Sequence, residues 1–444
     1  MTSEERHAAR RLRREKRREE KRQRFKAPYD TFSVMTDMDN LLDAARQSRK
    51  GVGKKASVQK YFMNLIGNTV GSRRKLLNGE DVRQGFIEFD LHERGKARHI
   101  KSMHFKERVI QRCICDRALV PVLKRPLVYD NGASLKDKGI HFAMFRLRDY
   151  LRRYYRQHGN WDGYVLIVDF SKYFDNIRHE PIRELLERSF DDQQLLDLAW
   201  SFVTAFGEIS IGIGSQVSQI LAVAYPSAAD HYVKEICRIG ASMRYMDDSI
   251  MISESREKLV EAFNGAKKIW DALGIRINEA KTQIIPMRRF TFIKVRYQCM
   301  PGGRVVMKPC RKSYTRMRRK LRKFRPFLQR GEMTMQQILA SYESWYGYQK
   351  HLDAQRAMRK MDQYFHELYN VWPKHGRKDQ RLSSGYIRIR TASWVLITII
   401  WPEMTAGSRR ISISIPTLSY STRRAQRFIS SSTGRRYCGP RKSA

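Results

Sequence analysis

The stretch RYMDDSIMI, from Arg244 to Ile252, places two adjacent carboxylates, Asp247 and Asp248, between two short apolar runs. The apolar runs predict two strands, and Asp is common in the tight turn that would join them. Most such Asp residues are structural, because their side chains bond to the backbone of their own turn. Two like charges side by side nevertheless repel each other, so another part of the sequence has to decide between a structural and a chemical role.

A third carboxylate ends another predicted strand. In LIVDFSKYFDNI, Asp169 follows the apolar run Val165 to Val168, and two strands of one sheet can bring Asp169 beside Asp247 and Asp248. Three acidic groups at one point repel each other unless a cation neutralises them, and such hard oxygen ligands select Mg²⁺ or Mn²⁺. Two such ions about 3.5–4 Å apart catalyse in-line phosphoryl transfer. The three carboxylates therefore indicate a polymerase or a nuclease.

The charge of the chain predicts a polyanionic partner. Its 444 residues carry 87 Lys and Arg against 45 Asp and Glu, a formal charge of +42, and this length is enough for two or three domains. Nucleic acid is the first candidate partner and an anionic membrane surface the second. The longest apolar run, Trp394 to Trp401, is far shorter than the roughly 20 residues that span a bilayer. We therefore expect no membrane insertion.

The first residues and the cysteine pattern indicate a cytoplasmic protein. Because the chain is polar from its second residue, we expect no secretory signal. The six cysteines form no CxxC pair and no Cys/His spacing typical of zinc, so we expect reduced thiols. They are Cys113, Cys115, Cys237, Cys299, Cys310 and Cys438.

Residues 1–28 predict a basic helix. Thr2 and Glu5 have the spacing of a capping box, and helix-forming residues follow almost without a break. The helix has little apolar face. It is therefore either a solvated charged helix or, as the basic composition favours, an element that grips an RNA or DNA backbone.

The centre of the chain alternates strands and helices. Residues 86–101 predict a hairpin around the turn signal ERGK, and Phe105 to Leu123 predict a helix. This order is typical of an α+β fold with helices on one face of a mostly antiparallel sheet. The elements predicted next are a strand and a helix over residues 163–190, a helix over 217–236, the hairpin around Asp247, a helix over 256–274 and a strand over 275–285.

The last part of the chain divides into two segments of different composition. From Arg311 to about Trp372 the pattern predicts basic helices. Residues 373–444 carry 15 Lys and Arg against only Asp379 and Glu403, with serine clusters and little periodicity. This segment is either a disordered basic tail or a stretch outside the functional domain, such as a shifted reading frame.

The motifs around the three carboxylates resemble those of a known family. YMDD, preceded by DFSKYFDNI and followed by GIRINEAKTQI, resembles the palm of reverse transcriptases of the bacterial lineage that includes group II intron proteins, retrons and diversity-generating retroelements. The resemblance covers roughly Phe86 to Leu368. It implies an α+β right-hand polymerase fold of fingers, palm and helical thumb. The implied domains are a basic helix at 1–28, fingers interleaved with palm at 29–160, palm at 161–300, thumb at 301–372 and the tail at 373–444.

The resemblance also implies roles for single residues. The implied metal ligands are Asp169, Asp247 and Asp248. The backbone carbonyl of Phe170 would assist them. Phe174 would block a ribose 2′-hydroxyl and so select deoxynucleotides, with a core Phe as the alternative. Lys281, in NEAKTQ, would protonate the pyrophosphate leaving group, as a general acid can; an ordinary exposed Lys is the alternative.

Other motifs would contact the nucleotide and the primer. RGKARHIKSMHFKERVIQ resembles the fingers motif whose basic side chains meet the triphosphate, with Arg98 the best match and Lys96 and Lys101 as alternatives. Tyr245 and Met246 of YMDD would complete the substrate site. FTFIKVRY fits the primer-grip hairpin, and SYESWYGYQKH resembles the thumb.

One motif departs from most reverse transcriptases. Where they carry Gln-Gly and then Ser-Pro, this chain reads IGSQVSQ, with Ile213, Gly214 and Gln219. The pattern IGxxxSQ resembles enzymes of diversity-generating retroelements, which misincorporate opposite template adenines. Ile213 cannot form the hydrogen bond that a Gln makes to the incoming nucleotide, which would loosen base selection. The residues after the thumb motif show no cysteine/histidine pattern of a DNA-binding or endonuclease module, which argues against a full mobile group II intron protein. The VTG signature expected of retron enzymes is not found in the thumb region.

We therefore interpret the chain as an RNA-directed DNA polymerase. It would use Mg²⁺ or Mn²⁺, deoxynucleoside triphosphates, an RNA template and a DNA or RNA primer, with an accessory nucleic-acid-binding protein as a further candidate partner. The setting would be a diversity-generating retroelement, with a phage-defence or other group II-like enzyme as the alternative. A non-catalytic, maturase-like RNA-binding protein is the rival of another class, but it has no need of carboxylates that repel a polyanion.

Overall fold

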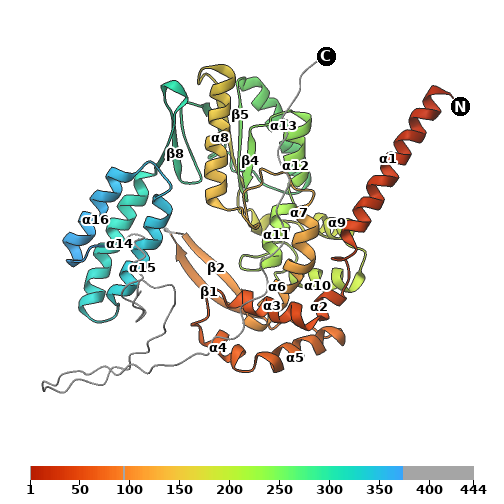
Figure 1. Cartoon of the computed structure of the whole chain (residues 1–444), viewed down its shortest axis with the longest axis horizontal. Helices are drawn as coiled ribbons and strands as arrows, with labels where there is room; N and C mark the ends of the chain where they lie inside the picture. Colours follow the sequence, from red (N-terminus) through yellow and green to blue (C-terminus); the bar gives the residue numbers. More distant parts are fainter. Residues whose placement is uncertain (1, 94–95, 374–444) are drawn as a thin grey trace, which may run out of the picture. The chain divides into compact units, whose positions relative to one another are not determined.

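The computed structural model describes residues 2–93 and 96–373 (Figure 1). These residues belong to one unit of the chain, Met1–His375. The basic segment predicted at 373–444 lies outside the described residues apart from Pro373, and the tip of the predicted hairpin, Arg94 and Gly95, lies outside them too.

The centre of the fold is a four-stranded antiparallel sheet with the strand order β4-β5-β3-β6. Its register places Asp169, the last residue of β3, opposite Asp248, the first residue of β5. The two carboxylates therefore stand at the same end of neighbouring strands, as the sequence predicts. The strands are β3 (Tyr164–Asp169), β4 (Ser242–Tyr245), β5 (Asp248–Ser253) and β6 (Gln283–Pro286).

Both faces of this sheet are covered. Leu166 and Val168 of β3 pack into a core with the helices α11 (Gln216–Ala224) and α13 (Arg256–Ala272), which is the helical face that the sequence predicts. The alternate residues Val165 and Ile167 point to the opposite face, because side chains alternate along a strand. That face is covered by α8 (Ile140–His158) and by a second sheet, which the pattern did not predict.

The second sheet contains the predicted primer-grip hairpin. Its strands β7 (Arg289–Phe292) and β8 (Val295–Cys299) are joined by Ile293 and Lys294, whose φ angles are +39° and +67°. Two consecutive positive φ angles are those of a tight type I′ hairpin turn. A third strand, β9 (Val305–Pro309), pairs with β8. It lies within residues 301–372, which the resemblance assigns to a helical thumb, and before Arg311, where the predicted helices begin.

The helix predicted over residues 217–236 is wrong as a single element. The structure breaks it into α11, α12 (Ser227–His231) and a π-helical turn, Tyr232–Ile236. The break falls at Pro226, because proline has no N–H to donate and its ring clashes with the carbonyl one turn earlier. After the break, Asp230 of α12 pairs with Arg244 of β4.

The strand predicted over residues 275–285 is also shorter than expected. Only Gln283–Pro286 form β6, while Ile277 makes an isolated bridge to Phe170. The N–H groups of Lys281 and Thr282 both donate to the carbonyl of Asn278, which makes residues 278–282 a turn. Because the N–H of Asn278 in turn donates to the carbonyl of Asp169 at 2.8 Å, this turn is fixed beside the end of β3.

The N-terminal part confirms the predicted basic helix and hairpin. The helix α1 (Ser3–Lys26) begins with the capping box of Thr2 and Glu5, and the strands β1 (Phe86–Glu93) and β2 (Lys96–Met103) pair antiparallel. The predicted helix over 105–123 is found as α6 and α7 with a π-helical turn, Cys115–Leu119, between them. The helices of this part are α2 (Ser33–Thr36), α3 (Met38–Arg49), α4 (Ala56–Met63), α5 (Leu65–Leu77), α6 (Phe105–Ile114) and α7 (Val120–Lys124).

The remaining helices complete the fold. In the central part these are α9 (His179–Ser189) and α10 (Gln193–Thr204); the last three are α14 (Arg311–Gln329), α15 (Met335–Gln349) and α16 (Gln355–Tyr369). The last three share a core around Leu321, Tyr342 and Phe365. None of the helices in residues 2–93 and 96–373 has the length and apolar composition needed to cross a membrane. The five cysteines in the same ranges are free thiols.

We predict that Phe365→Ala lowers the free energy of unfolding by about 3–5 kcal/mol, because it leaves a cavity where a fully buried ring now packs. Phe327→Ala is the matched control, since Phe327 is 38% exposed on the neighbouring helix α14. Urea unfolding followed by circular dichroism measures both. Equal losses in the two variants would contradict the predicted core of α14–α16.

Candidate active site

The backbone gathers three carboxylates at one end of the central sheet. Tyr245 of β4 is opposite Asp248 of β5, so Met246 and Asp247 form the turn between the two strands. Met246 has a φ of +56°, in the left-handed region that such a turn requires. The N–H of Phe170, just after Asp169, donates to the carbonyl of Asp247 at 3.2 Å. This hydrogen bond ties the turn to the end of β3.

The electrostatics of Asp248 show that the three carboxylates act on one another. Burial, together with the negative charges of Asp247 and Asp169, raises the pKa of Asp248 to about 7. Lys281 and Lys294 oppose this increase in pKa. A carboxyl held in this way favours its neutral form unless a positive charge is brought close.

Lys281 supplies one such charge to the site. Its Nζ lies 2.9 Å from Oδ1 and 2.7 Å from Oδ2 of Asp169. The Lys281 side chain is 56% exposed, whereas that of Asp169 is 14% exposed. The predicted general acid and a predicted metal ligand are therefore in direct contact. The sequence predicted a strand at residues 278–282, but the structure has a short turn, and this turn places the Lys281 ammonium beside Asp169.

The donor set suits a divalent cation. Three carboxylates offer the hard oxygen ligands that Mg²⁺ and Mn²⁺ prefer, and a cation would relieve the repulsion that raises the pKa of Asp248. Within residues 2–93 and 96–373, however, no three His, Cys, Asp or Glu side chains are gathered as a metal-binding group. Asp169 is paired with Lys281 instead. The metal role of the three carboxylates remains a prediction.

Phe170 and Phe174 lie just after the first carboxylate. Phe170 is 3% exposed, and its ring packs edge-on against that of Trp270, so its side chain belongs to the core. Phe174 is half-buried, and its carbonyl accepts a hydrogen bond from the N–H of Ile211 at 3.3 Å. That bond brings the segment containing the unusual IGSQVSQ motif against the predicted sugar-selecting residue.

The IGSQVSQ motif also contacts the predicted fingers hairpin. Gly214 has a φ of +122°, and a Cβ there would lie 3.2 Å from the carbonyl oxygen of Lys101 in β2. Ser215 donates a hydrogen bond to the buried Gln111 of α6 at 2.9 Å. Ile213 remains 40% exposed, and Gln219 is exposed on α11. The structure therefore joins this motif to both Phe174 and β2.

The predicted triphosphate-binding residues lie in β2. The Nζ of Lys101 is 3.8 Å from a carboxylate oxygen of Glu88 and 5.6 Å from the centre of the Phe86 ring. Arg98 is placed by its backbone opposite Leu91. Tyr245, at the end of β4, is half-buried. Its burial, and to a lesser extent the charge of Asp247, raises the pKa of its hydroxyl.

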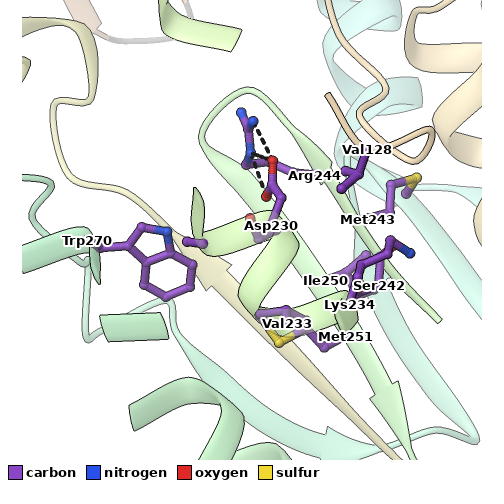
Figure 2. Close-up of a pocket in the computed structure, with 12 residues that line it drawn as sticks. Val128, Asp230, Val233, Lys234, Ser242, Met243, Arg244, Ile250, Met251 and Trp270 are labelled. Atoms are coloured by element: carbon purple, nitrogen blue, oxygen red, sulfur yellow. Dashed lines mark hydrogen bonds and ion pairs between the residues drawn. The ribbon is translucent and has the colours of Figure 1, made fainter. Parts of the chain in front are cut away.

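The sequence analysis missed Arg244, which is 2% exposed. Figure 2 shows its guanidinium paired with the carboxylate of Asp230 from α12, and their closest atoms are 2.7 Å apart. The same guanidinium donates to the carbonyl of Met246 at 3.3 Å and to that of Val223 at 2.7 Å. It therefore links the turn between β4 and β5 to α11 and α12. The available signal was a charged residue at the end of a buried apolar strand.

The fold defines a class of protein. An antiparallel sheet that gathers carboxylates beside a lysine, with helices packed on it, is an α+β polymerase-like fold. Residues 88–297 match the family model described as reverse transcriptase (RNA-dependent DNA polymerase). The match contains Asp169, Asp247, Asp248 and Lys281. Over these residues the chain is thus similar to reverse transcriptases.

Individual proteins are similar to parts of the chain. Protein YkfC from Escherichia coli (strain K12) is 22% identical over 233 residues, covering 43% of this chain and 60% of YkfC. The structure of telomerase from Candida albicans in complex with a fragment of telomeric RNA matches with a TM-score of 0.40 and 13% identity, over 59% of this chain and 55% of that chain. Apo telomerase from Candida tropicalis gives a TM-score of 0.38, 13% identity and coverages of 59% and 57%. The chain spans less than two thirds of each relative.

We predict that Arg244→Leu lowers the free energy of unfolding by about 3–5 kcal/mol, because it leaves the carboxylate of Asp230 without its buried partner. Arg288→Leu is the matched control, since the Arg288–Asp162 pair is exposed on both sides and should contribute less than about 1 kcal/mol. Urea unfolding measures both variants. A loss for Arg244→Leu no larger than that of the control would show that the buried pair does not stabilise the hairpin.

Proposed function

We propose that this protein is an RNA-directed DNA polymerase that copies an RNA template into cDNA. The observation that carries the proposal is the register of β3 and β5, which sets Asp169 opposite Asp248 with Asp247 in the adjoining turn. This arrangement lies within the reverse transcriptase domain. The proposed substrates are deoxynucleoside triphosphates and a primer, DNA or RNA, paired to the template.

In this proposal the three carboxylates hold divalent cations, with Mg²⁺ as the first choice and Mn²⁺ as a substitute. When bound, two such ions activate the attacking 3′-hydroxyl of the primer and stabilise the leaving pyrophosphate. The domains proposed for the chain remain the basic helix at 1–28, fingers at 29–160, palm at 161–300 and thumb at 301–372.

Lys281 would act as the general acid of the reaction. Its ammonium already lies within hydrogen-bonding distance of Asp169, and its side chain is more than half exposed, so it can reach a group that binds at the carboxylates. The proton that it carries would pass to the leaving pyrophosphate, which needs one as negative charge develops on it. The half-buried ring of Phe174 would exclude a ribose 2′-hydroxyl by steric contact.

The setting that we propose is a diversity-generating retroelement. Ile213 is 40% exposed in the motif that adjoins both Phe174 and β2, where its side chain offers no hydrogen bond to an incoming nucleotide. Loss of one polar contact relaxes the geometric selection of a base pair. Faithful copying in a phage-defence or other group II-like setting is the alternative that a fidelity measurement would favour.

Primer extension by the purified full-length chain on a defined RNA template, with Mg²⁺ or Mn²⁺ and deoxynucleoside triphosphates, tests the activity. We predict that Asp247→Ala/Asp248→Ala lowers the extension rate by at least about 10³-fold, since metal-assisted stabilisation is worth several kcal/mol and each ~1.4 kcal/mol is tenfold. Removing two mutually repelling carboxylates should leave thermal stability unchanged or higher.

Asp175→Ala is the control for this variant, because Asp175 is an exposed carboxylate in the same DFSKYFDNI segment. Its extension rate should equal that of the wild type. If the wild-type protein binds the template but extends no primer with either metal, the result would contradict the proposed polymerase activity. It would instead support the non-catalytic RNA-binding alternative.

The fidelity of the product tests the role of Ile213. We predict that Ile213→Gln lowers misincorporation opposite template adenines by about 2- to 10-fold, because a hydrogen bond worth about 0.5–1.5 kcal/mol is restored. Sequencing of the extension products measures the error rate at each template base. Ile209→Gln is the control, since Ile209 is 59% exposed in the same segment; equal error rates in the two variants would contradict the proposal.

A further inference from the structure

A groove of 720 Å³ lies between α1 and the body of the reverse transcriptase domain, and none of the residues predicted for the active site lines it. Figure 1 shows the C-terminal end of α1 meeting the body near α7 and α9. The floor of the groove is apolar and includes Val122, Leu185, Tyr225 and Leu273. A groove with such a floor can contact the faces of flat, apolar groups.

The two walls of the groove are cationic. On α1, Arg18, Lys21 and Arg22 line it together with Phe25, a spacing that puts all four on one face of the helix. Arg125 and Arg188 line it from the body. Glu184 is the only carboxylate among the described lining residues. The groove therefore attracts an anion on both sides of an apolar floor.

The end of α1 that forms the wall is firmly attached. Lys26 is 4% exposed, and its Nζ lies 2.7 Å from a carboxylate oxygen of Asp191 and 3.1 Å from one of Asp30. The guanidinium of Arg125 stands 4.4 Å from the centre of the Phe25 ring. These contacts hold the last turn of α1 against the body, so the groove does not need to form when a ligand arrives.

We propose that this groove binds a single-stranded segment of RNA outside the active site; the inference rests on the proposed use of an RNA template. Phosphates would pair with the cations of the two walls. Unpaired bases would meet the apolar floor and the planar guanidinium of Arg125, because both surfaces stack on base faces. A duplex hides its base faces and would leave the floor unused.

The composition of α1 favours RNA over an acidic protein partner. A helix of another protein would need an apolar seam along α1, whose only large apolar residues are Leu12 and Phe25. Lys and Arg occur instead on every side of α1, far beyond the groove. A flexible polyanion can follow such a surface, whereas an acidic peptide would satisfy a few of its charges.

Binding of a fluorescein-labelled 30-nucleotide unstructured RNA to the full-length chain, without metal or nucleotides, tests the proposal. The groove variant is Arg18→Gln/Lys21→Gln/Arg22→Gln, and the control is Arg13→Gln/Lys16→Gln/Arg24→Gln, three residues of α1 that do not line the groove. The two variants lose the same charge. Arg188→Gln, across the groove on α9, is a second variant that leaves α1 intact. Fluorescence anisotropy at several salt concentrations gives the Kd and its salt dependence.

We expect the groove variant to raise the Kd for RNA at least about tenfold over the control. The plot of log K against log salt should become less steep by about 2, since three phosphate contacts are lost. Arg188→Gln should raise the Kd in the same direction. Equal effects of the two triple variants would overturn the site in favour of diffuse charge attraction. If none of the variants changes the RNA affinity, the proposed RNA site would also be overturned, and an acidic protein would become the better candidate for the groove. Primer extension by the wild type decides the proposed function separately.

Discussion

The register of β3 against β5 is the constraint on which the rest of this structure depends. It sets Asp169 opposite Asp248, and a slip of one residue would turn every side chain of β3 to the other face of the sheet. Both faces are buried, so such a slip would exchange Leu166 and Val168 with Val165 and Ile167 between two separately packed cores. The apolar cores therefore fix the position of the polar site, although they contribute no atom to its chemistry.

Opposite charges hold this site from two sides. In front, Lys281 contacts Asp169, and burial and mutual repulsion raise the pKa of Asp248. Behind the turn, Arg244 is buried against Asp230 and donates to the carbonyl of Met246. A buried pair of this kind is costly to desolvate and gives little net stability against apolar residues of the same size. Its value here is geometric, because an apolar side chain could not hold a turn carbonyl and two helices together.

The loop at residues 130–132 is joined to the same hairpin. Asn131 bridges Arg244 in a parallel register, and the N–H of Gly132 donates to the carbonyl of Arg244 at 2.8 Å. Asp130, the preceding residue, pairs with Arg146 and Lys234. A Cβ at position 132 would lie 3.2 Å from that of Ala143, so glycine is the residue that lets the loop approach so closely. The loop and the hairpin that carries Asp247 and Asp248 are thus held together.

The sequence by itself determined the class of fold, the strands that carry the carboxylates and the reverse transcriptase resemblance. It did so because apolar alternation, turn residues and paired acids are local signals, and DFSKYFDNI and YMDD carry them within a few residues each. The break at Pro226 also had a local signal, the proline itself. Two features needed the tertiary structure: the turn that brings Lys281 to Asp169, and the burial of Arg244 against Asp230. The contacts in these features join residues far apart in the chain, and a charged residue in a sequence does not reveal whether it meets water or a distant partner. The groove beside α1 is of the same kind, because helical spacing alone gives α1 a cationic face but does not show that the face meets the apolar surface around Leu185 and Tyr225.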